Sequence, residues 1–161
     1  MKCLDKINSY LEKAESILLV IILSVMVLLA FLQVLLRNFF DQGILWADIF
    51  LRHLVLWVGF IGASLATKEE KHISIDLLTR FLSKRNQHIA RLITNLFAFI
   101  ICLILANAGW TFVQYEKSGG TILFSNIQAW YFQIIIPFGF LLMAFRFLLL
   151  SLSYLQRIIK E

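Results

Sequence analysis

Three polar side chains lie close together in an otherwise apolar stretch, and they are the first candidates for chemistry. Asp48 and Arg52 are four residues apart, and His53 follows directly. On a helix, an acid four residues before a base shares its face and can form an ion pair with it. Three interpretations stay open: an ion pair at a helix start that reaches water, a contact between helices or subunits that could include Arg37, and a proton or ion relay.

His53 is a weak candidate for a cofactor ligand. Haem between membrane helices needs suitably placed axial ligands, and the other two histidines, His72 and His88, fall in a charged segment further along the chain. The sequence shows no serine–histidine–acid set, cysteine cluster or phosphate-binding loop, and we take Asp48 as the only acid within the membrane. We therefore predict no catalytic residue, cofactor or metal site, and expect that the protein is not an enzyme.

The composition places these residues in a lipid environment. The chain has 161 residues, of which 60% are hydrophobic, whereas soluble domains contain about 45–50%. A chain of this length cannot bury so much apolar surface in its own core. The formal net charge of +5 is better explained by basic loops beside membrane spans than by nucleic-acid binding, which we do not expect.

Four apolar segments are long enough to cross a bilayer, which takes about 20 helical residues. They cover about residues 16–36, 47–67, 89–112 and 129–150. Period-two alternation is absent, so helices rather than a barrel should satisfy the backbone. We predict an all-α membrane protein in which residues 1–161 form a single integral membrane domain with four transmembrane helices.

Two further segments have the pattern of amphipathic helices at the membrane surface. One is the N-terminal segment, where Leu4, Ile7, Leu11 and Ala14 share a face. The other follows the second span, with Ile73, Leu77, Leu78, Phe81 and Leu82 on one face; a solvated connector helix explains that pattern equally well. Lysine and arginine gather in both ends and in this second loop, so both termini should be cytoplasmic.

Several residues within the spans indicate contacts. Small residues four apart in the second span let helices approach closely; they are Gly59, Gly62, Ala63 and Ala66, and we favour packing within the chain over docking to another chain. We expect Pro137 to kink the fourth span. Arg146 should extend toward the interface and meet a lipid phosphate or a partner carboxylate.

Taken together, these motifs resemble the small membrane subunit of tripartite ATP-independent periplasmic (TRAP) transporters. The resemblance is carried by the order and spacing of Arg37, Trp46, Asp48, Arg52, Trp57, Gly62, Ala63, His72, Ile73, Ile75 and Asp76, and by "IIIPFGFLLMAFRFL" from Ile134 to Leu148. It covers nearly the whole chain. One departure is Ile49, where many members of the family carry a second acid.

The resemblance implies a non-catalytic small subunit of a binding-protein-dependent, sodium-coupled importer of organic acids in the bacterial inner membrane. Its partners would be a large elevator-type membrane subunit, which it braces, a periplasmic binding protein, which it helps to dock, and membrane lipids. Arg37, Trp46, Asp48, Arg52, Trp57 and Arg146 are the expected subunit or lipid contacts. The alternative is a self-sufficient small oligomeric transporter or channel.

Overall fold

The four apolar segments form four long helices in the computed structural model, which describes residues 2–68, 84–124 and 126–160. The helices are α1 (Lys2–Phe40), α2 (Leu45–Lys68), α4 (Lys84–Gly119) and α6 (Ile135–Lys160). Their stretches long and apolar enough to cross a membrane are Ser9–Phe40, Leu45–Thr67, Asn86–Gly119 and Trp130–Ile159. The prediction of an all-α protein with four membrane-crossing helices is confirmed.

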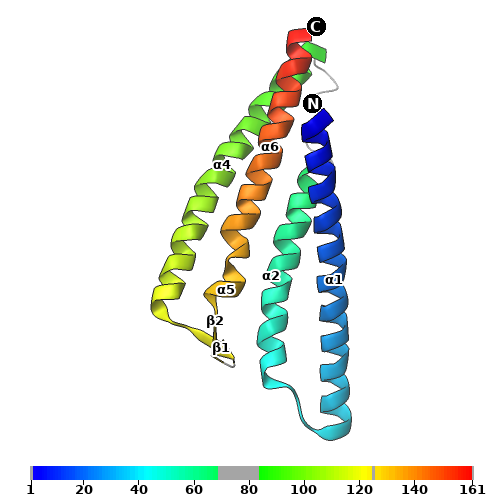
Figure 1. Ribbon diagram of the computed structural model, residues 1–161, viewed down its shortest axis with the longest axis vertical. Coiled ribbons are helices and arrows are strands. Elements are labelled where there is room, and N and C mark those ends of the chain that lie inside the picture. Colours follow the sequence, from blue (N-terminus) through cyan, green and yellow to red (C-terminus); the bar gives the residue numbers. More distant parts are fainter. Residues whose placement is uncertain (1, 69–83, 125, 161) are drawn as a thin grey trace.

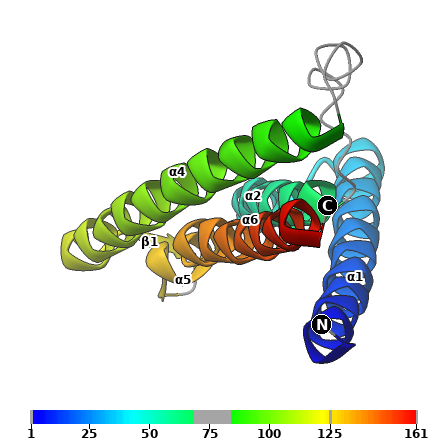
Figure 2. The same cartoon turned by 90° about the horizontal axis from the view of Figure 1, so that it is seen from above.

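The helices pair as two hairpins, α1 with α2 and α4 with α6 (Figure 1). α6 also packs against α2, and this contact joins the two hairpins. Seen from above, α2 and α6 lie in the middle, while α1 and α4 lie on opposite sides and are inclined to them (Figure 2). Both chain ends lie at the same end of the molecule. We call that end the terminal end and the opposite end the turn end.

The N-terminal segment differs from the expectation of a separate surface helix. α1 runs without a break from Lys2 to Phe40, a length of 39 residues. At 1.5 Å per residue this is roughly 58 Å, well beyond the ~30 Å of a bilayer core. The first turns can therefore extend past the lipid tails without a bend, and their placement at the membrane surface stays a prediction. The second predicted surface helix lies outside the described residues.

A short hairpin closes the turn end between α4 and α6. Strands β1 (Ile122–Phe124) and β2 (Ile127–Gln128) pair antiparallel, and a one-turn helix, α5 (Trp130–Gln133), follows. Asn126 has φ 63°, a left-handed conformation that asparagine tolerates in tight turns. The helical path is then interrupted at Ile134, so Pro137 lies in the first turn of α6, where its missing N–H costs little.

Two glycines mark where α6 comes closest to its neighbours. A Cβ atom on Gly139 would lie 2.6 Å from Cδ1 of Phe60 in α2. A Cβ atom on Gly109 in α4 would lie 3.1 Å from Cγ2 of Ile136 and 3.3 Å from the backbone nitrogen of Pro137. All three distances are shorter than ordinary van der Waals contacts. α6 therefore packs closely against α2 through its own Gly139 and against α4 through Gly109 of that helix.

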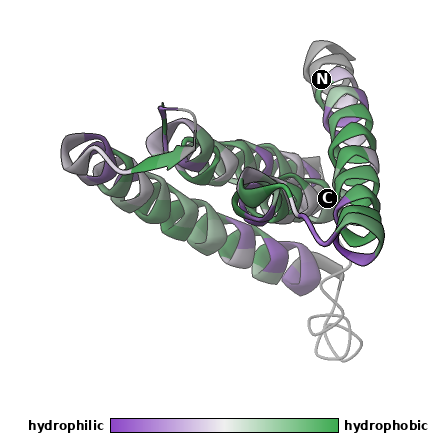
Figure 3. Ribbon diagram, turned by 90° about the horizontal axis from the view of Figure 1, so that it is seen from below, coloured by the Kyte–Doolittle hydropathy of each residue, from purple (hydrophilic) through white to green (hydrophobic). Residues whose placement is uncertain are grey.

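The internal core is small for a chain of this size. Its buried centre consists of Ile22, Leu54, Ile61 and Ile135. Many large apolar side chains instead are exposed on all four helices, including Val27, Phe31, Phe97 and Ile104. The hydrophobic colour runs along much of each helix (Figure 3). Such a surface is stable only in contact with lipid or with another membrane protein.

Candidate functional site

The first polar cluster lies at the turn between α1 and α2 and contains Asp48. The Nη2 atom of Arg37 donates to Oδ2 of Asp48 at 3.0 Å. Nε2 of Gln33 donates to the carbonyl of Ile44 at 3.1 Å, and Oε1 of Gln33 accepts from the Ile44 N–H at 3.0 Å. One amide side chain of α1 thus satisfies both backbone groups of the residue that precedes α2. We call Gln33, Arg37 and Asp48 the turn cluster.

The ion pair of Asp48 differs from the one that helical spacing predicts. The carboxylate pairs with Arg37 across the turn, whereas Arg52 is exposed and forms no ion pair with a described residue. Asp48 lies in the first turn of α2, so its side chain is held beside the end of α1 by Gln33 and Arg37. Of the three interpretations that the sequence left open, this pair fits the contact between helices that includes Arg37; the spacing rule for a single helix does not consider the neighbouring helix.

His53 and the two tryptophans of α2 have partners within the chain. Nδ1 of His53 lies 2.8 Å from the carbonyl oxygen of Ile49, one turn earlier. Nε1 of Trp57 donates to the carbonyl of Phe132 at 2.9 Å, which ties α2 to α5. Trp46 is partly exposed and its ring meets Phe50 edge-on at 6.1 Å. Trp57 therefore joins helices inside the chain, while Trp46 lies partly exposed at the surface.

The second polar cluster is buried between α1, α2 and α6. Nη2 of Arg146 donates to Oε2 of Glu15, and Nη1 donates to the backbone carbonyl of Ser64. Oγ of Ser64 donates to Oε1 of Glu15 at 3.2 Å. The side chains of Arg146 and Glu15 are only 3% and 8% exposed. We call Glu15, Ser64 and Arg146 the buried cluster; it joins three helices through one guanidinium group.

Glu15 is the residue that sequence reasoning missed. It lies one position before the expected first span, and the sequence analysis, which took Asp48 as the only acid within the membrane, did not single it out. In the structure Glu15 falls inside the apolar stretch Ser9–Phe40. Arg146 is the residue in the sequence that could have pointed to Glu15, because an arginine within a span almost always pairs with an acid or with backbone carbonyls.

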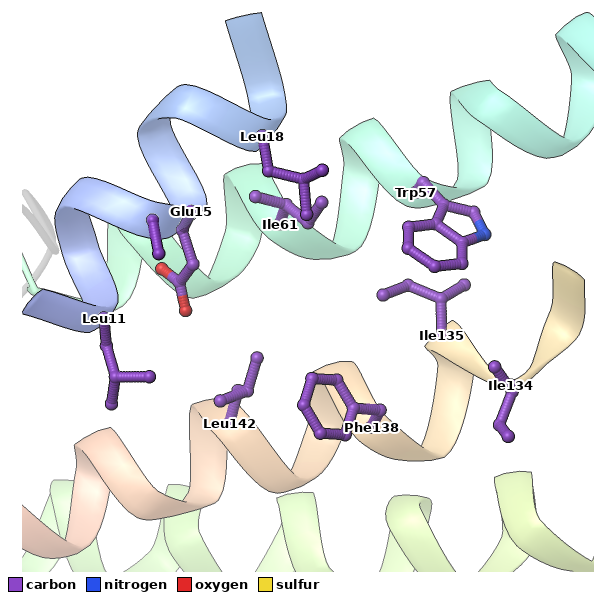
Figure 4. Close-up of a pocket in the computed structure, with 10 residues that line it drawn as sticks. Leu11, Glu15, Leu18, Trp57, Ile61, Ile134, Ile135, Phe138 and Leu142 are labelled. Carbon is purple, nitrogen blue, oxygen red and sulfur yellow. The ribbon is translucent and has the colours of Figure 1, made fainter. Parts of the chain in front are cut away.

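A cavity of about 380 Å³ opens beside the buried cluster, between α1, α2 and α6. Figure 4 shows Glu15 extending from α1 toward α6 across one end of it. The residues that line it are Leu11, Ala14, Glu15, Leu18, Trp57, Ile61, Ile134, Ile135, Phe138 and Leu142. Glu15 is their only ionisable member and it is paired with Arg146, and none of these lining residues is a cation that could bind an organic anion. The cavity is suited to apolar groups.

The small residues of α2 lie on two sides of the helix. Gly62 faces Leu19 of α1, whose Cδ1 would lie 3.8 Å from an added Cβ atom. Gly59 has nothing within 4 Å of its added Cβ position, and Ala63 and Ala66 are exposed. Packing within the chain therefore involves Gly62, whereas Gly59, Ala63 and Ala66 form an outward-facing stripe. Its use by another chain stays a prediction.

The turn cluster and the buried cluster are separate, one at the turn end and one between α1, α2 and α6, and each joins helices to one another. Within the described residues, no group of three histidine, cysteine, aspartate or glutamate side chains is placed to hold a metal ion. Both clusters have geometries that fix helix positions.

Comparison with protein families gives a match over most of the chain. Residues 26–157 match the family described as tripartite ATP-independent periplasmic transporters, DctQ component. The matched range includes α2 and α4 entirely and α6 up to Arg157, and it begins within α1. It contains the turn cluster and Arg146, while Glu15 lies before it.

Individual relatives are named as permease proteins of TRAP transporters. A protein of Haemophilus influenzae named as a TRAP transporter small permease is 36% identical over 107 residues, covering 66% of this chain and 65% of the relative. The C4-dicarboxylate TRAP transporter small permease protein DctQ of Vibrio cholerae is 24% identical, covering 67% and 47%. The sialic acid TRAP transporter permease protein SiaT of Haemophilus influenzae is 24% identical, covering 72% and 19%. The chain thus spans less than two thirds of the length of each.

Proposed function

The chain belongs to the family of DctQ components of tripartite ATP-independent periplasmic transporters, and from this premise we propose that it is the small membrane subunit of a binding-protein-dependent, ion-coupled importer. It is a multi-pass membrane protein, and its role is that of a transport component rather than an enzyme. The observation that carries the proposal is the family match over residues 26–157, together with four membrane-crossing helices that supply a large apolar outer surface.

The proposed role within the importer is to brace a large, elevator-type subunit. An elevator mechanism needs one part that stays still while another part slides across the bilayer. The buried cluster ties α1, α2 and α6 together, and the turn cluster ties α1 to α2 at the turn end. Because these contacts fix the helices in depth and in register, the small subunit can widen the static part and resist its tilting.

The surface that meets the large subunit is proposed to include the outward stripe of α2. Gly59, Ala63 and Ala66 leave room for a second helix to approach closely, as small residues do in membrane helix pairs. The outward apolar side chains of α1 and α4 extend the available surface. A large subunit seated there would cover apolar groups that otherwise contact lipid.

The turn end is proposed to face the periplasm of the bacterial inner membrane. Both chain ends lie at the terminal end, and the excess of lysine and arginine in both chain ends favours the cytoplasm for that side. The turn end then offers the turn cluster, the exposed Arg52 and the β1–β2 hairpin. We assign this polar surface to docking of the periplasmic binding protein.

The substrate is proposed to be an organic acid, with sodium as the coupling ion. Two relatives are named for C4-dicarboxylate and for sialic acid, and both substrates carry carboxylates. The cavity beside Glu15 has no cationic lining group, so we place the substrate site on the large subunit. Substitutions in this chain should therefore change the rate of uptake and leave the choice of substrate unchanged.

Affinity purification from the native membrane tests the proposal. The tagged chain, solubilised in a mild detergent, should retain a many-span membrane protein at a ratio near one to one, and uptake in vesicles should require both proteins and a binding protein. A Gly59→Leu variant should fold but lose the large partner, whereas Gly119→Ala, which also has open space around it, is the matched control. Substrate transport by the purified chain alone would contradict the proposal and support the self-sufficient transporter.

A further inference from the structure

The cavity between α1, α2 and α6 lies at the middle of the bilayer. Trp57 and Ile61 line it, and they lie at and one turn beyond the centre of the apolar stretch Leu45–Thr67 of α2, which has 23 residues. At 1.5 Å per residue this stretch is roughly 34 Å long, close to the ~30 Å of a bilayer core. The material that surrounds the protein at the level of the cavity is therefore the hydrocarbon of acyl chains.

The polar side chains in the cavity walls already have partners. Among the described residues that line the cavity, those with polar side chains are Glu15 and Trp57. The two carboxylate oxygens of Glu15 accept from Ser64 and from Arg146, and Nε1 of Trp57 donates to the carbonyl of Phe132. Polar groups of a ligand would lose hydration that these occupied side chains do not replace. The walls therefore favour a ligand whose inserted part is apolar.

The long direction of the cavity follows the helices. α1 lines it from Leu11 to Leu18 and α6 lines it from Ile135 to Leu142, which is about 10 Å along each helix at 1.5 Å per residue. Figure 4 shows α1 and α6 on opposite sides of the cavity. Because these helices cross the membrane, the cavity is elongated across the bilayer, which is also the direction in which acyl chains extend.

The open side of the cavity suits a flexible chain better than another helix. Three of its lining residues, Leu18, Ile134 and Phe138, are 40%, 39% and 56% exposed, so the cavity opens between large apolar side chains. Membrane helices approach each other closely where small residues face the contact. Of the described lining residues only Ala14 is small, whereas the outward stripe of α2 consists of small residues. An acyl chain can bend around large side chains and fill the space between them.

We propose that the cavity binds one acyl chain of a membrane phospholipid, which lies between α1 and α6 and covers Trp57 and Ile61. The volume of about 380 Å³ falls within the range of ligand pockets, roughly 300–1,000 Å³. Walls without neighbouring atoms forfeit dispersion contacts, and the inserted chain supplies them. The chain also fills the space between α1 and α6 next to the ion pair of Glu15 and Arg146. The inference does not depend on the proposed transport role.

Quenching of Trp57 fluorescence by brominated acyl chains tests the site. The full-length chain, with Trp46, Trp110 and Trp130 replaced by phenylalanine, is reconstituted into vesicles of dioleoylphosphatidylcholine or of the same lipid brominated at the middle of its acyl chains. Bromine quenches tryptophan on contact, so an inserted chain should reduce the emission of Trp57 at least about twofold. Ile104→Trp, placed in a chain whose own tryptophans are all replaced by phenylalanine, is the lipid-facing reference and should also be quenched, because Ile104 is 63% exposed.

Filling the cavity should protect Trp57 from the quencher. The double variant Ala14→Phe/Leu142→Phe adds one ring from α1 and one from α6, and it should lower the quenching of Trp57 about twofold or more, because close-packed walls leave no room for the chain. The matched control Leu105→Phe/Ala108→Phe adds the same rings at exposed positions of α4 and should leave the quenching unchanged. Circular dichroism of both variants checks that the helices are retained.

A variant that opens the cavity keeps the test independent of how well the filled chain folds. Phe138→Ala removes an exposed lining ring and should increase the quenching of Trp57, so a decrease would contradict the proposal. Absence of quenching in brominated vesicles would leave the cavity to a helix of another chain and would overturn the proposal, as would equal quenching in the filled variant and its control. Recovery of the emission with a small mole fraction of unbrominated oleic acid would assign the cavity to a free fatty acid and overturn the phospholipid assignment.

Discussion

The turn cluster and the buried cluster both join α1 to α2 through charged side chains, but water reaches only one of them. In the turn cluster the side chains of Arg37 and Asp48 are 63% and 43% exposed. In the buried cluster Arg146 and Glu15 are almost entirely covered, and Ser64 is fully buried. The same kind of ion pair therefore has two different energetic consequences in one chain.

Exposure decides what each ion pair contributes. Charges that remain in contact with water are screened, and such pairs are worth about 0–1 kcal/mol. A buried pair has lost its hydration, so removing one partner leaves an uncompensated charge and costs roughly 3–5 kcal/mol. The turn cluster therefore sets the geometry of a surface, whereas the buried cluster determines whether three helices stay together.

The largest effect is expected for Arg146→Ala. This variant leaves Glu15 buried without its cation, so the free energy of unfolding should fall by about 3–5 kcal/mol. Detergent-induced unfolding, followed by tryptophan fluorescence, measures it. The double variant Glu15→Gln/Arg146→Gln should lose less than Arg146→Ala, because no net charge is left buried. Equal stability of Arg146→Ala and the unmodified chain would remove the distinction between the clusters.

Ser64→Ala should have a smaller effect on the same cluster. It removes the hydroxyl that donates to Glu15 but keeps the backbone carbonyl that accepts from Arg146, so we expect a loss of about 1 kcal/mol. Ser151→Ala is the matched control, since Ser151 is also buried but donates only to Phe147 of its own helix. If both variants lost the same free energy of unfolding in the same assay, the hydrogen bond from Ser64 to Glu15 would contribute no more to stability than the bond from Ser151 to Phe147.

The turn cluster should tolerate the loss of its charges. Arg37→Ala or Asp48→Ala should reduce the free energy of unfolding by at most about 1 kcal/mol. This loss should shrink further at high salt, because exposed charges are screened. Unfolding at low and at high salt measures both effects. A loss as large and as independent of salt as that of Arg146→Ala would show that the two clusters are energetically alike.

Arg52→Ala should leave the unfolding free energy unchanged within about 0.5 kcal/mol. The side chain is exposed and forms no ion pair with a described residue. Under the proposed function, however, the variant should retain less of the binding protein or the large subunit in pull-downs from the native membrane. Full retention together with full uptake would remove Arg52 from the proposed docking surface.

Hydropathy alone was sufficient to predict the four long helices. Their apolar lengths follow directly from the thickness of the bilayer, so the segments at residues 16–36 and 89–112 lie within α1 and α4. The β1–β2 hairpin was not predicted, since strands of three and two residues leave almost no periodic signal.

The partners of the charged residues could not be predicted from spacing. Helical spacing favoured Arg52 for Asp48, yet the turn brings Arg37 closer. Arg146 and Glu15 are 131 positions apart, and their meeting depends on how α6 and α1 pack on α2. Rules that act within one helix cannot choose between partners that other helices supply.

The uninterrupted length of α1 has a consequence for the membrane around it. A helix longer than the bilayer normally adapts by tilting or by sliding along its axis, at a cost of fractions of a kcal/mol per ångström of mismatch. Glu15 is bound to Arg146 of α6, so α1 cannot slide independently of the bundle. A thinner or thicker bilayer must then deform around the protein or tilt it as a unit, and this links the stability of the protein to the lipid composition of the membrane.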